Sequence, residues 1–253
     1  GPGRRETFRV VLWDLERADA VPRPLDLAAE ARPPWSPPPA VAFAPDGRSL
    51  AVAVAGETTI RMFNAEDGGE SRSIEAPADV RALAMGAGGL LAAASQGTIQ
   101  VWNLARPDAQ AFVTSLPTQG FVSRLQFDPT GTLLAATFWA ANMQPAPKVE
   151  LWDAATFKPV AVLAAAHPVS DVAFSADGRT LVAGGANLST TTWRIREPRA
   201  RATAVGLEGK PFSASFREDG LLAVADLDGD VWAWNPDPAT PAAGRPPYRV
   251  VAG

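Results

Sequence analysis

A short motif recurs six times along this chain of 253 residues, and it limits what the chain can fold into. In each copy, apolar residues at alternate positions lead to an aromatic residue, which Asp or Asn usually follows. The aromatic residues lie 50, 39, 50, 41 and 41 residues apart and are Trp13, Phe63, Trp102, Trp152, Trp193 and Trp234. A period of about 40 residues is typical of folds built from repeated supersecondary units. We therefore expect six related structural units.

A second motif, an apolar strand pattern that ends in Asp-Gly or an equivalent turn, lies ahead of each full copy. It is clearest in residues 41–50, 125–134 and 172–181, and weaker in residues 83–90 and 215–222. Asp-Gly supplies the positive φ that a tight hairpin requires. No segment shows a sustained helical period, and the 24 prolines would interrupt most helices. The sequence therefore predicts an all-β chain.

Together these motifs, for example residues 43–47 (Phe-Ala-Pro-Asp-Gly) and Trp152-Asp153, resemble the WD-repeat family of β-propellers over nearly the whole chain. The resemblance implies blades of four antiparallel strands, named a to d from the central channel outward. The Asp-Gly turn would join a to b, and the aromatic residue would end c. We expect one propeller domain, cut from a larger protein, with a partial blade at residues 8–27 and complete blades at 40–77, 78–117, 121–164, 168–206 and 211–253.

Composition excludes several classes of function. The chain has no Cys and one His, so it offers no thiolate nucleophile, Cys-based metal site or multi-His metal site. A pI of about 5.1 argues against binding nucleic acid. No apolar run of about 18 residues predicts a membrane span. We expect a cytoplasmic protein with no cofactor, and the Ala-rich, Arg-over-Lys composition is typical of a high-GC bacterial genome.

One short segment has the residue types of a hydrolase triad. His167, Ser170 and Asp171 lie close together in sequence, whereas a triad is recognised by its geometry. The resemblance gives His167 the place of a structural His of the family. We therefore expect a structural role for His167.

Two further motifs favour turns over ligand sites. Residues 226–230 alternate Asp as a calcium loop does, but they lack the distal Glu and fall at a predicted b–c turn. Residues 86–89 are Gly-rich, but no helix follows to direct amides at a phosphate. An acidic metal site formed by Asp79, Asp171 and Asp228 in the channel remains an open alternative.

The resemblance places the b–c and d–a loops on one face, which this family commonly uses for protein partners. The predicted b–c loop at residues 138–147 is long and carries an aromatic residue and a Met, types enriched in interface cores. An equal alternative to partner binding is that this aromatic residue, Trp139, folds back on its own blade. The Pro-rich connection at residues 33–39 is expected to be a rigid tether. We expect partners to bind this top face through Arg81, Phe121, Ser123, Trp139, Met143, Lys210 and Phe212.

The predicted function is a non-catalytic protein-interaction scaffold. The alternatives are a ligand- or partner-sensing domain of a larger bacterial signalling protein, such as a kinase or a nucleotide-driven switch, and, less favoured, a propeller hydrolase. Strand counting adds one expectation. Residues 8–27 supply only a c strand and a d strand, so the ring lacks one a–b hairpin. We expect another chain, a separate segment of the parent protein or a symmetry-related copy of this chain to complete it.

Overall fold

The computed structural model describes residues 10–14, 21–27, 37–77, 79–107, 111–138, 147–165, 167–185, 189–195, 202–206, 211–227, 229–236 and 248–250. These residues form strands, turns and a short 3₁₀ segment, η1 (Ala87–Gly89), without any α-helix, so the predicted all-β class is confirmed. Among them, no helical segment reaches the length and hydrophobicity of a transmembrane helix. The chain divides into two compact units, Gly1–Pro117 and Thr118–Gly253, and each is described by itself.

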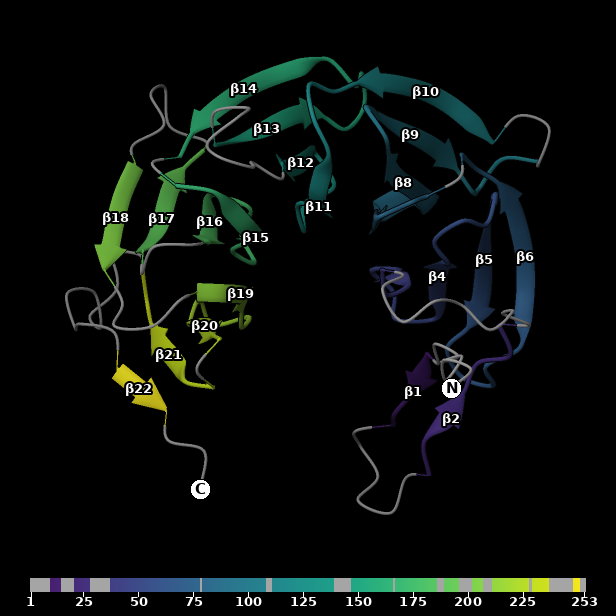
Figure 1. Ribbon diagram of the computed structural model, residues 1–253, viewed down its shortest axis with the longest axis horizontal. Coiled ribbons are helices and arrows are strands. Elements are labelled where there is room, and N and C mark those ends of the chain that lie inside the picture. The colour runs from purple at the N-terminus through teal and green to yellow at the C-terminus, as the bar shows by residue number, and fades with distance from the viewer. Residues whose placement is uncertain are drawn as a thin grey trace, which may run out of the picture. The chain divides into compact units, whose positions relative to one another are not determined.

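The first unit contains a two-stranded sheet and two four-stranded sheets, in which strands adjacent in sequence pair antiparallel. Figure 1 shows β6 and β10 on the outer side of their sheets. The strands of the short sheet are β1 (Val11–Leu12) and β2 (Arg23–Pro24). The four-stranded sheets are β3 (Ala40–Phe43), β4 (Ser49–Ala53), β5 (Thr59–Asn64) and β6 (Glu70–Glu75), then β7 (Ala82–Gly86), β8 (Leu90–Ser95), β9 (Thr98–Asn103) and β10 (Phe112–Pro117).

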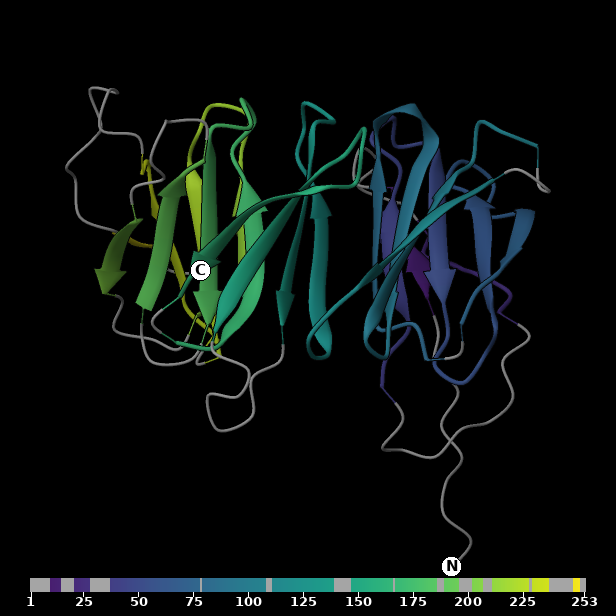
Figure 2. The same ribbon diagram turned by 90° about the horizontal axis from the view of Figure 1, so that it is seen from above.

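The second unit contains three four-stranded antiparallel sheets of the same order. Within it, β14, β18 and β22 lie along the outer side and β11, β15 and β19 along the inner side (Figure 1), and Figure 2 shows the strands from the side. The sheets are β11 (Val122–Phe127), β12 (Leu133–Phe138), β13 (Lys148–Asp153) and β14 (Pro159–Ala164); β15 (Val169–Phe174), β16 (Thr180–Gly185), β17 (Ser189–Arg194) and β18 (Ala202–Gly206); and β19 (Pro211–Phe216), β20 (Leu222–Asp226), β21 (Val231–Trp234) and β22 (Tyr248–Val250).

The two-stranded sheet is shorter than the sequence predicts. The expected strands span Arg9–Asp14 and Val21–Leu27, whereas β1 and β2 have two residues each. Pro22 and Pro24 have no N–H to donate, and both fit in this strand because their nitrogens alternate with that of Leu25, which faces β1, and therefore lie on the outer edge of β2. One further backbone bond, from the Leu25 N–H to the Val10 carbonyl at 2.8 Å, continues the ladder between the strands.

The turns between first and second strands form as predicted. Gly178 has a φ of 65° in the turn between β15 and β16, which a residue with a side chain adopts only with strain. In the weaker copy, Gly88 and Gly89 also have positive φ, and η1 joins β7 to β8. The Gly-rich segment is therefore a hairpin turn, as the sequence indicates.

Turn carboxylates in the second unit have lowered pKa values. At Asp177, burial raises the pKa, but hydrogen bonds from Ser175 Oγ at 2.6 Å and the Arg179 N–H at 3.0 Å lower it by more. At Asp219, hydrogen bonds from the Arg217 guanidinium and then the Leu221 N–H lower the pKa to about 2. These charged side chains stabilise turns that present no apolar surface to a core.

In the four-stranded sheets, the recurring aromatic residues of the third strands are buried. In the second unit, Trp193 is 3% exposed and packs with Leu151 and Leu163 of the preceding sheet. In the first unit, Phe63 is 1% exposed and Trp102 is 4% exposed, and each lies in a cluster between two sheets. Side-chain packing between sheets is thus the main source of stability.

Replacing a buried aromatic residue should destabilise the fold far more than replacing an exposed one. We expect Trp193→Ala to lower the free energy of unfolding by about 3–5 kcal/mol, because it leaves a large cavity between two sheets. Trp13 is 61% exposed, and Trp13→Ala is the matched control with little expected effect. Urea unfolding followed by circular dichroism measures both, and equal losses would contradict the proposed core.

Acid should weaken the fold below about pH 4. A carboxylate whose folded pKa lies below its unfolded value stabilises the fold above the unfolded pKa, and this contribution is lost as pH falls through the folded pKa. For Asp219 the window runs from about 3.8 down to about 2. We expect both Asp219→Asn and Arg217→Gln to reduce the slope of stability against pH in this window. Urea unfolding at several pH values tests this, and slopes equal to that of the unchanged chain would contradict it.

Candidate functional site

The structure describes part of the predicted top-face set. Arg81 is exposed and lies just before β7 in the first unit, where its N–H donates to the Ala94 carbonyl at 2.9 Å. Phe121 and Ser123 lie at the start of β11 in the second unit. The backbone of Phe212 lies in β19 of the same unit. Trp139, Met143 and Lys210 lie outside the described residues, so the gathering of the whole set on one face stays a prediction.

Three inner strands of the second unit share a β-bulge near their first residue. The pairing register shifts between Val122 and Arg124 in β11, and between the equivalent residues of β15 and β19. The residues at the shifts are Ser123, Ser170 and Phe212. Ser123 and Phe212 therefore occupy equivalent positions, and Ser170 is the third. A bulge turns side chains away from the regular alternation and is frequent next to functional sites.

The residues that follow these bulges form a polar row across the three strands. Arg124, Asp171 and Ser213 occupy the same position of β11, β15 and β19. Arg124 Nε lies 3.0 Å from Asp171 Oδ1, and Ser213 Oγ donates to Asp171 Oδ2 at 3.1 Å. The row therefore links the inner strands of three successive sheets.

Asp171 is the centre of this row. Its side chain is 9% exposed, and it also accepts from the Ala214 N–H at 3.1 Å and from its neighbour, the Val172 N–H, at 3.0 Å. A buried carboxylate requires such partners because losing water without replacement bonds is costly. The carboxylate interacts with Arg124 of β11 and with Ser213 and Ala214 of β19, so it links β15 to both neighbouring inner strands.

Arg124 and Phe121 form the exposed part of this site. The Arg124 side chain is 56% exposed although Asp171 holds its Nε. Phe121, three residues earlier, is 51% exposed. Ser123 lies between them, with its Oγ 2.7 Å from Thr137 Oγ1. Aromatic residues and Arg are enriched in protein interfaces, and here one of each is exposed within a segment of four residues.

The sequence missed Arg124 and Ser213, and it considered Ser170 only for a triad and Asp171 only for a triad or a metal site. A signal was present, because aligning residues 122–127, 169–174 and 211–216 places the polar residues in one column. The alignment does not reveal the ion pair between Arg124 and Asp171. This ion pair forms because neighbouring strands bring Arg124 Nε to 3.0 Å from Asp171 Oδ1.

The other candidate sites are turns or strand ends. In the 226–230 segment, Asp226 Oδ1 accepts from the Asp230 N–H at 2.8 Å, and the Asp226 N–H donates to the Asp230 carbonyl at 2.9 Å, which confirms the turn. In the first unit, Asp79 accepts from the Gly56 N–H at 3.0 Å. Asp228 lies outside the described residues. In the part of the chain that is described, no three His, Asp or Glu side chains form a metal-binding group.

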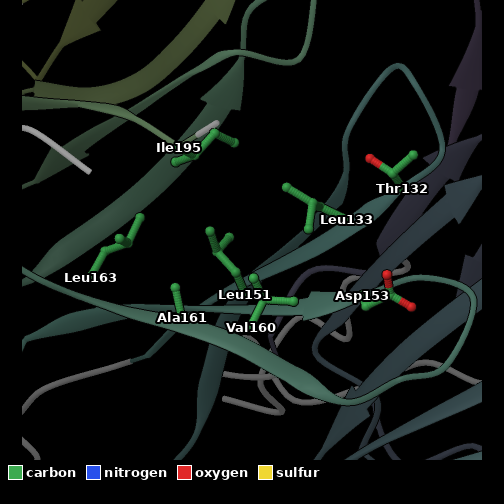
Figure 3. A pocket seen from close by; sticks show the side chains of 8 residues that line it. All are labelled: Thr132, Leu133, Leu151, Asp153, Val160, Ala161, Leu163 and Ile195. Carbon is green, nitrogen blue, oxygen red and sulfur yellow. The ribbon is translucent and has the colours of Figure 1, made fainter. Parts of the chain in front are cut away.

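An apolar groove lies on the same unit (Figure 3). Its volume is about 290 Å³, and its lining comes from β12, β13 and β14 and from a residue just after β17. In Figure 3, Thr132 and Asp153 lie at one end, and Asp153 accepts hydrogen bonds from Thr156 Oγ1 at 2.7 Å and the Thr156 N–H at 2.8 Å. The rest of the lining is Leu133, Leu151, Val160, Ala161, Leu163 and Ile195. These six side chains offer apolar contact area.

Comparison with known proteins agrees with this architecture. Residues 157–193 match the WD40 family, described as WD domain, G-beta repeat. This stretch begins just before the outer strand β14 and ends at Trp193 in β17, so one sequence repeat supplies the last strand of one sheet and three strands of the next. The predicted resemblance to the WD-repeat family is confirmed, and the four-stranded antiparallel sheets are consistent with blades of that family.

A longer part of the chain is similar to a fungal protein. Over 133 residues it is 27% identical to periodic tryptophan protein 2 homolog of Neurospora crassa. The match covers 52% of this chain and 14% of that protein. The chain thus corresponds to a small part of this relative.

Removing the centre of the polar row should destabilise the second unit. We expect Asp171→Ala to lower the free energy of unfolding by about 1–3 kcal/mol, because the Ala214 N–H and the Ser213 hydroxyl lose a buried acceptor. Asp46→Ala is the matched control, since Asp46 is an exposed turn residue that accepts from the Arg48 N–H at 2.9 Å. Urea unfolding measures both variants. Equal losses would show that the row adds no more than an exposed turn does.

Proposed function

We propose that this chain is a non-catalytic protein-interaction scaffold whose partners bind where the inner strands begin. WD40 repeats are generally protein-interaction scaffolds, which supports the class of function. The binding surface of the proposal comprises Arg81, Phe121, Ser123, Trp139, Met143, Lys210 and Phe212, to which the structure adds Arg124. The proposal also includes one propeller domain and a cytoplasmic location, for which a chain without cysteine is suited.

The observation that carries this proposal is the exposed pair of Phe121 and Arg124. Phe121 is 51% exposed, and the Arg124 side chain is 56% exposed. An exposed aromatic ring and an exposed guanidinium three residues apart are both of types enriched in protein interfaces. The pair supplies apolar area and a directional donor on one short segment.

The mechanism of binding is rigid display. Asp171 ties β11 to β15 and β19, so Arg124 is held before any partner arrives. Ordering a flexible side chain on binding costs about 0.5–1.5 kcal/mol, and a positioned side chain avoids much of that cost. The bulge at Ser123 also fixes the direction of the strand next to Phe121.

The partner can be found by photocrosslinking from the proposed surface. A photoreactive phenylalanine analogue replaces Phe121 in one sample and Phe112 in the control, within the parent protein in its own cells. Phe112 is 52% exposed on the outer strand β10, so it matches Phe121 in residue type and exposure. We expect a protein partner to be captured from position 121 and not from position 112.

The affinity of the captured partner then tests the residues. We expect Phe121→Ala and Arg124→Ala each to weaken binding by about 10- to 100-fold, and Phe112→Ala to leave it unchanged. Isothermal titration calorimetry measures the three dissociation constants. Binding that survives both changes, or that depends on Phe112, would refute the proposed surface.

A further inference from the structure

A groove lies between the two four-stranded sheets of the first unit, where the inner strands β3 and β7 end. Its volume is about 410 Å³. Its lining includes Pro45 and Met62 from one sheet, and Met85, Leu104 and the turn at residues 86–89 from the other. Small-molecule sites have volumes of about 300 to 1,000 Å³ and are lined mainly by apolar side chains. The groove therefore has the size and the lining of a small-molecule site.

Met85 stands where the other four-stranded sheets have a phenylalanine. It lies opposite Leu91 of β8, and Leu91 lies opposite Trp102 of β9. By the same pairing, the equivalent residues of the other sheets are Phe43, Phe127, Phe174 and Phe216. The unbranched thioether chain of Met is narrower than a phenyl ring, so it leaves part of the space between the sheets open.

The second unit shows how the same space is filled when the phenylalanine is present. Phe174 is 4% exposed and shares a core cluster with Leu151 of the preceding sheet. Leu133, labelled in Figure 3, holds the place of Ser49 by strand pairing. The first unit therefore has a narrower side chain, Met85, and a smaller one, Ser49, at two positions that are filled by large apolar residues in the second unit.

A third groove separates the effects of these two positions. It lies between the last two sheets of the second unit, has a volume of about 170 Å³ and is lined in part by Thr180 and Phe216. Thr180 is the counterpart of Ser49 by strand pairing, so this position is small in both grooves. The groove with the ring of Phe216 is nevertheless the smaller one. Met85 is therefore the main reason for the larger groove of the first unit.

The lining favours one kind of ligand. Met62 is 4% exposed and lies in a core cluster against which Met85 and Leu104 pack. Methionine sulfur makes favourable contacts with aromatic rings. Asp46 is the charged side chain among the lining residues, and it is exposed. Its Oδ1 accepts a hydrogen bond from the Arg48 N–H at 2.9 Å, which leaves Oδ2 to face a cation at the mouth of the groove.

We propose that this groove binds a small molecule in which an aromatic ring carries a cationic amino group. The ring lies between Met62 and Met85, and the amino group pairs with Asp46. The inference goes beyond the proposed function, because the groove lies where the inner strands end, whereas Phe121 and Arg124 lie at the start of β11.

The three methionines of the chain make this site directly observable. The chain is isotope-labelled at the methionine methyl groups, the NMR signals are assigned with Met→Leu variants, and tryptamine is titrated in. An aromatic ring shifts the signals of methyl groups that it contacts. We expect the signals of Met62 and Met85 to move and that of Met143 to stay, with a dissociation constant of about 1 mM or tighter. Unchanged Met62 and Met85 signals would overturn the proposal.

Two variants that fill the groove locate the ligand. Met85→Phe introduces the residue of the other sheets, and Ser49→Leu introduces the residue type of Leu133. We expect each to weaken tryptamine binding by at least about tenfold, measured from the Met62 methyl signal. Val162→Phe is the control, since it adds a ring at a position of β14 that is 63% exposed, and it should leave binding unchanged. Circular dichroism checks that each variant is folded, and full affinity in both folded groove variants would refute the site.

The charge is tested without filling the groove. Tryptophol has the same ring as tryptamine and a hydroxyl group in place of the ammonium group. We expect it to bind about two- to fivefold more weakly, as the loss of an exposed ion pair implies. Asp46→Asn keeps an acceptor for the Arg48 N–H and should abolish this difference. Equal affinity of the two compounds for the unchanged chain would show that Asp46 selects no cation, contrary to the proposal.

A peptide arm distinguishes a small molecule from a protein segment. The dipeptide Phe-Lys, acetylated and amidated at its ends, carries a ring and a cation on a peptide backbone. We expect it to bind more weakly than tryptamine. Tighter binding of the dipeptide at Met62 and Met85 would identify a protein segment as the occupant and overturn the proposal. Phe121→Ala and Arg124→Ala should not affect tryptamine binding, so failure here is distinguishable from failure of the proposed function.

Discussion

The contact between neighbouring sheets is the interaction on which the rest of the structure depends. A four-stranded antiparallel sheet has two apolar faces here, and neither can be buried within one repeat. Stacking repeats buries each face against the next, and the aromatic residue of the third strand fills the space between them, as Trp193 does beside Leu151. Burial of these faces explains why a chain of alternating apolar strands is stable as a series of packed four-stranded sheets.

The same contact positions the candidate binding surface. Because inner strands lie side by side, one carboxylate, Asp171, can bond to both neighbouring strands at once. A buried polar group with all its partners in place holds these strands in one arrangement. Phe121 and Arg124 then project from a surface that does not need to be ordered when a partner binds.

Local features of the fold could be predicted from the sequence. Asp-Gly turns, alternating apolar strands and the period of the aromatic residues are properties of short segments, and they indicated the strands correctly. Equivalence of positions such as Ser123 and Phe212 also follows from aligning repeats. The polar row could not be predicted in this way, since Asp171 and Ala214 are 43 residues apart and meet only through stacking of sheets.

The clearest division between sequence and tertiary structure lies in two copies of one motif. The pattern of apolar residues and the Asp-Gly turn is nearly the same in residues 41–50 and 172–181. This pattern predicts a strand, a turn and a second strand in both segments, and both segments form them. Phe174 is nevertheless 4% exposed and Phe43 is 55% exposed. The sequence determined the hairpins because backbone preferences and turn chemistry act over a few residues. The tertiary structure decided which face is buried, because burial depends on the sheet that lies across it.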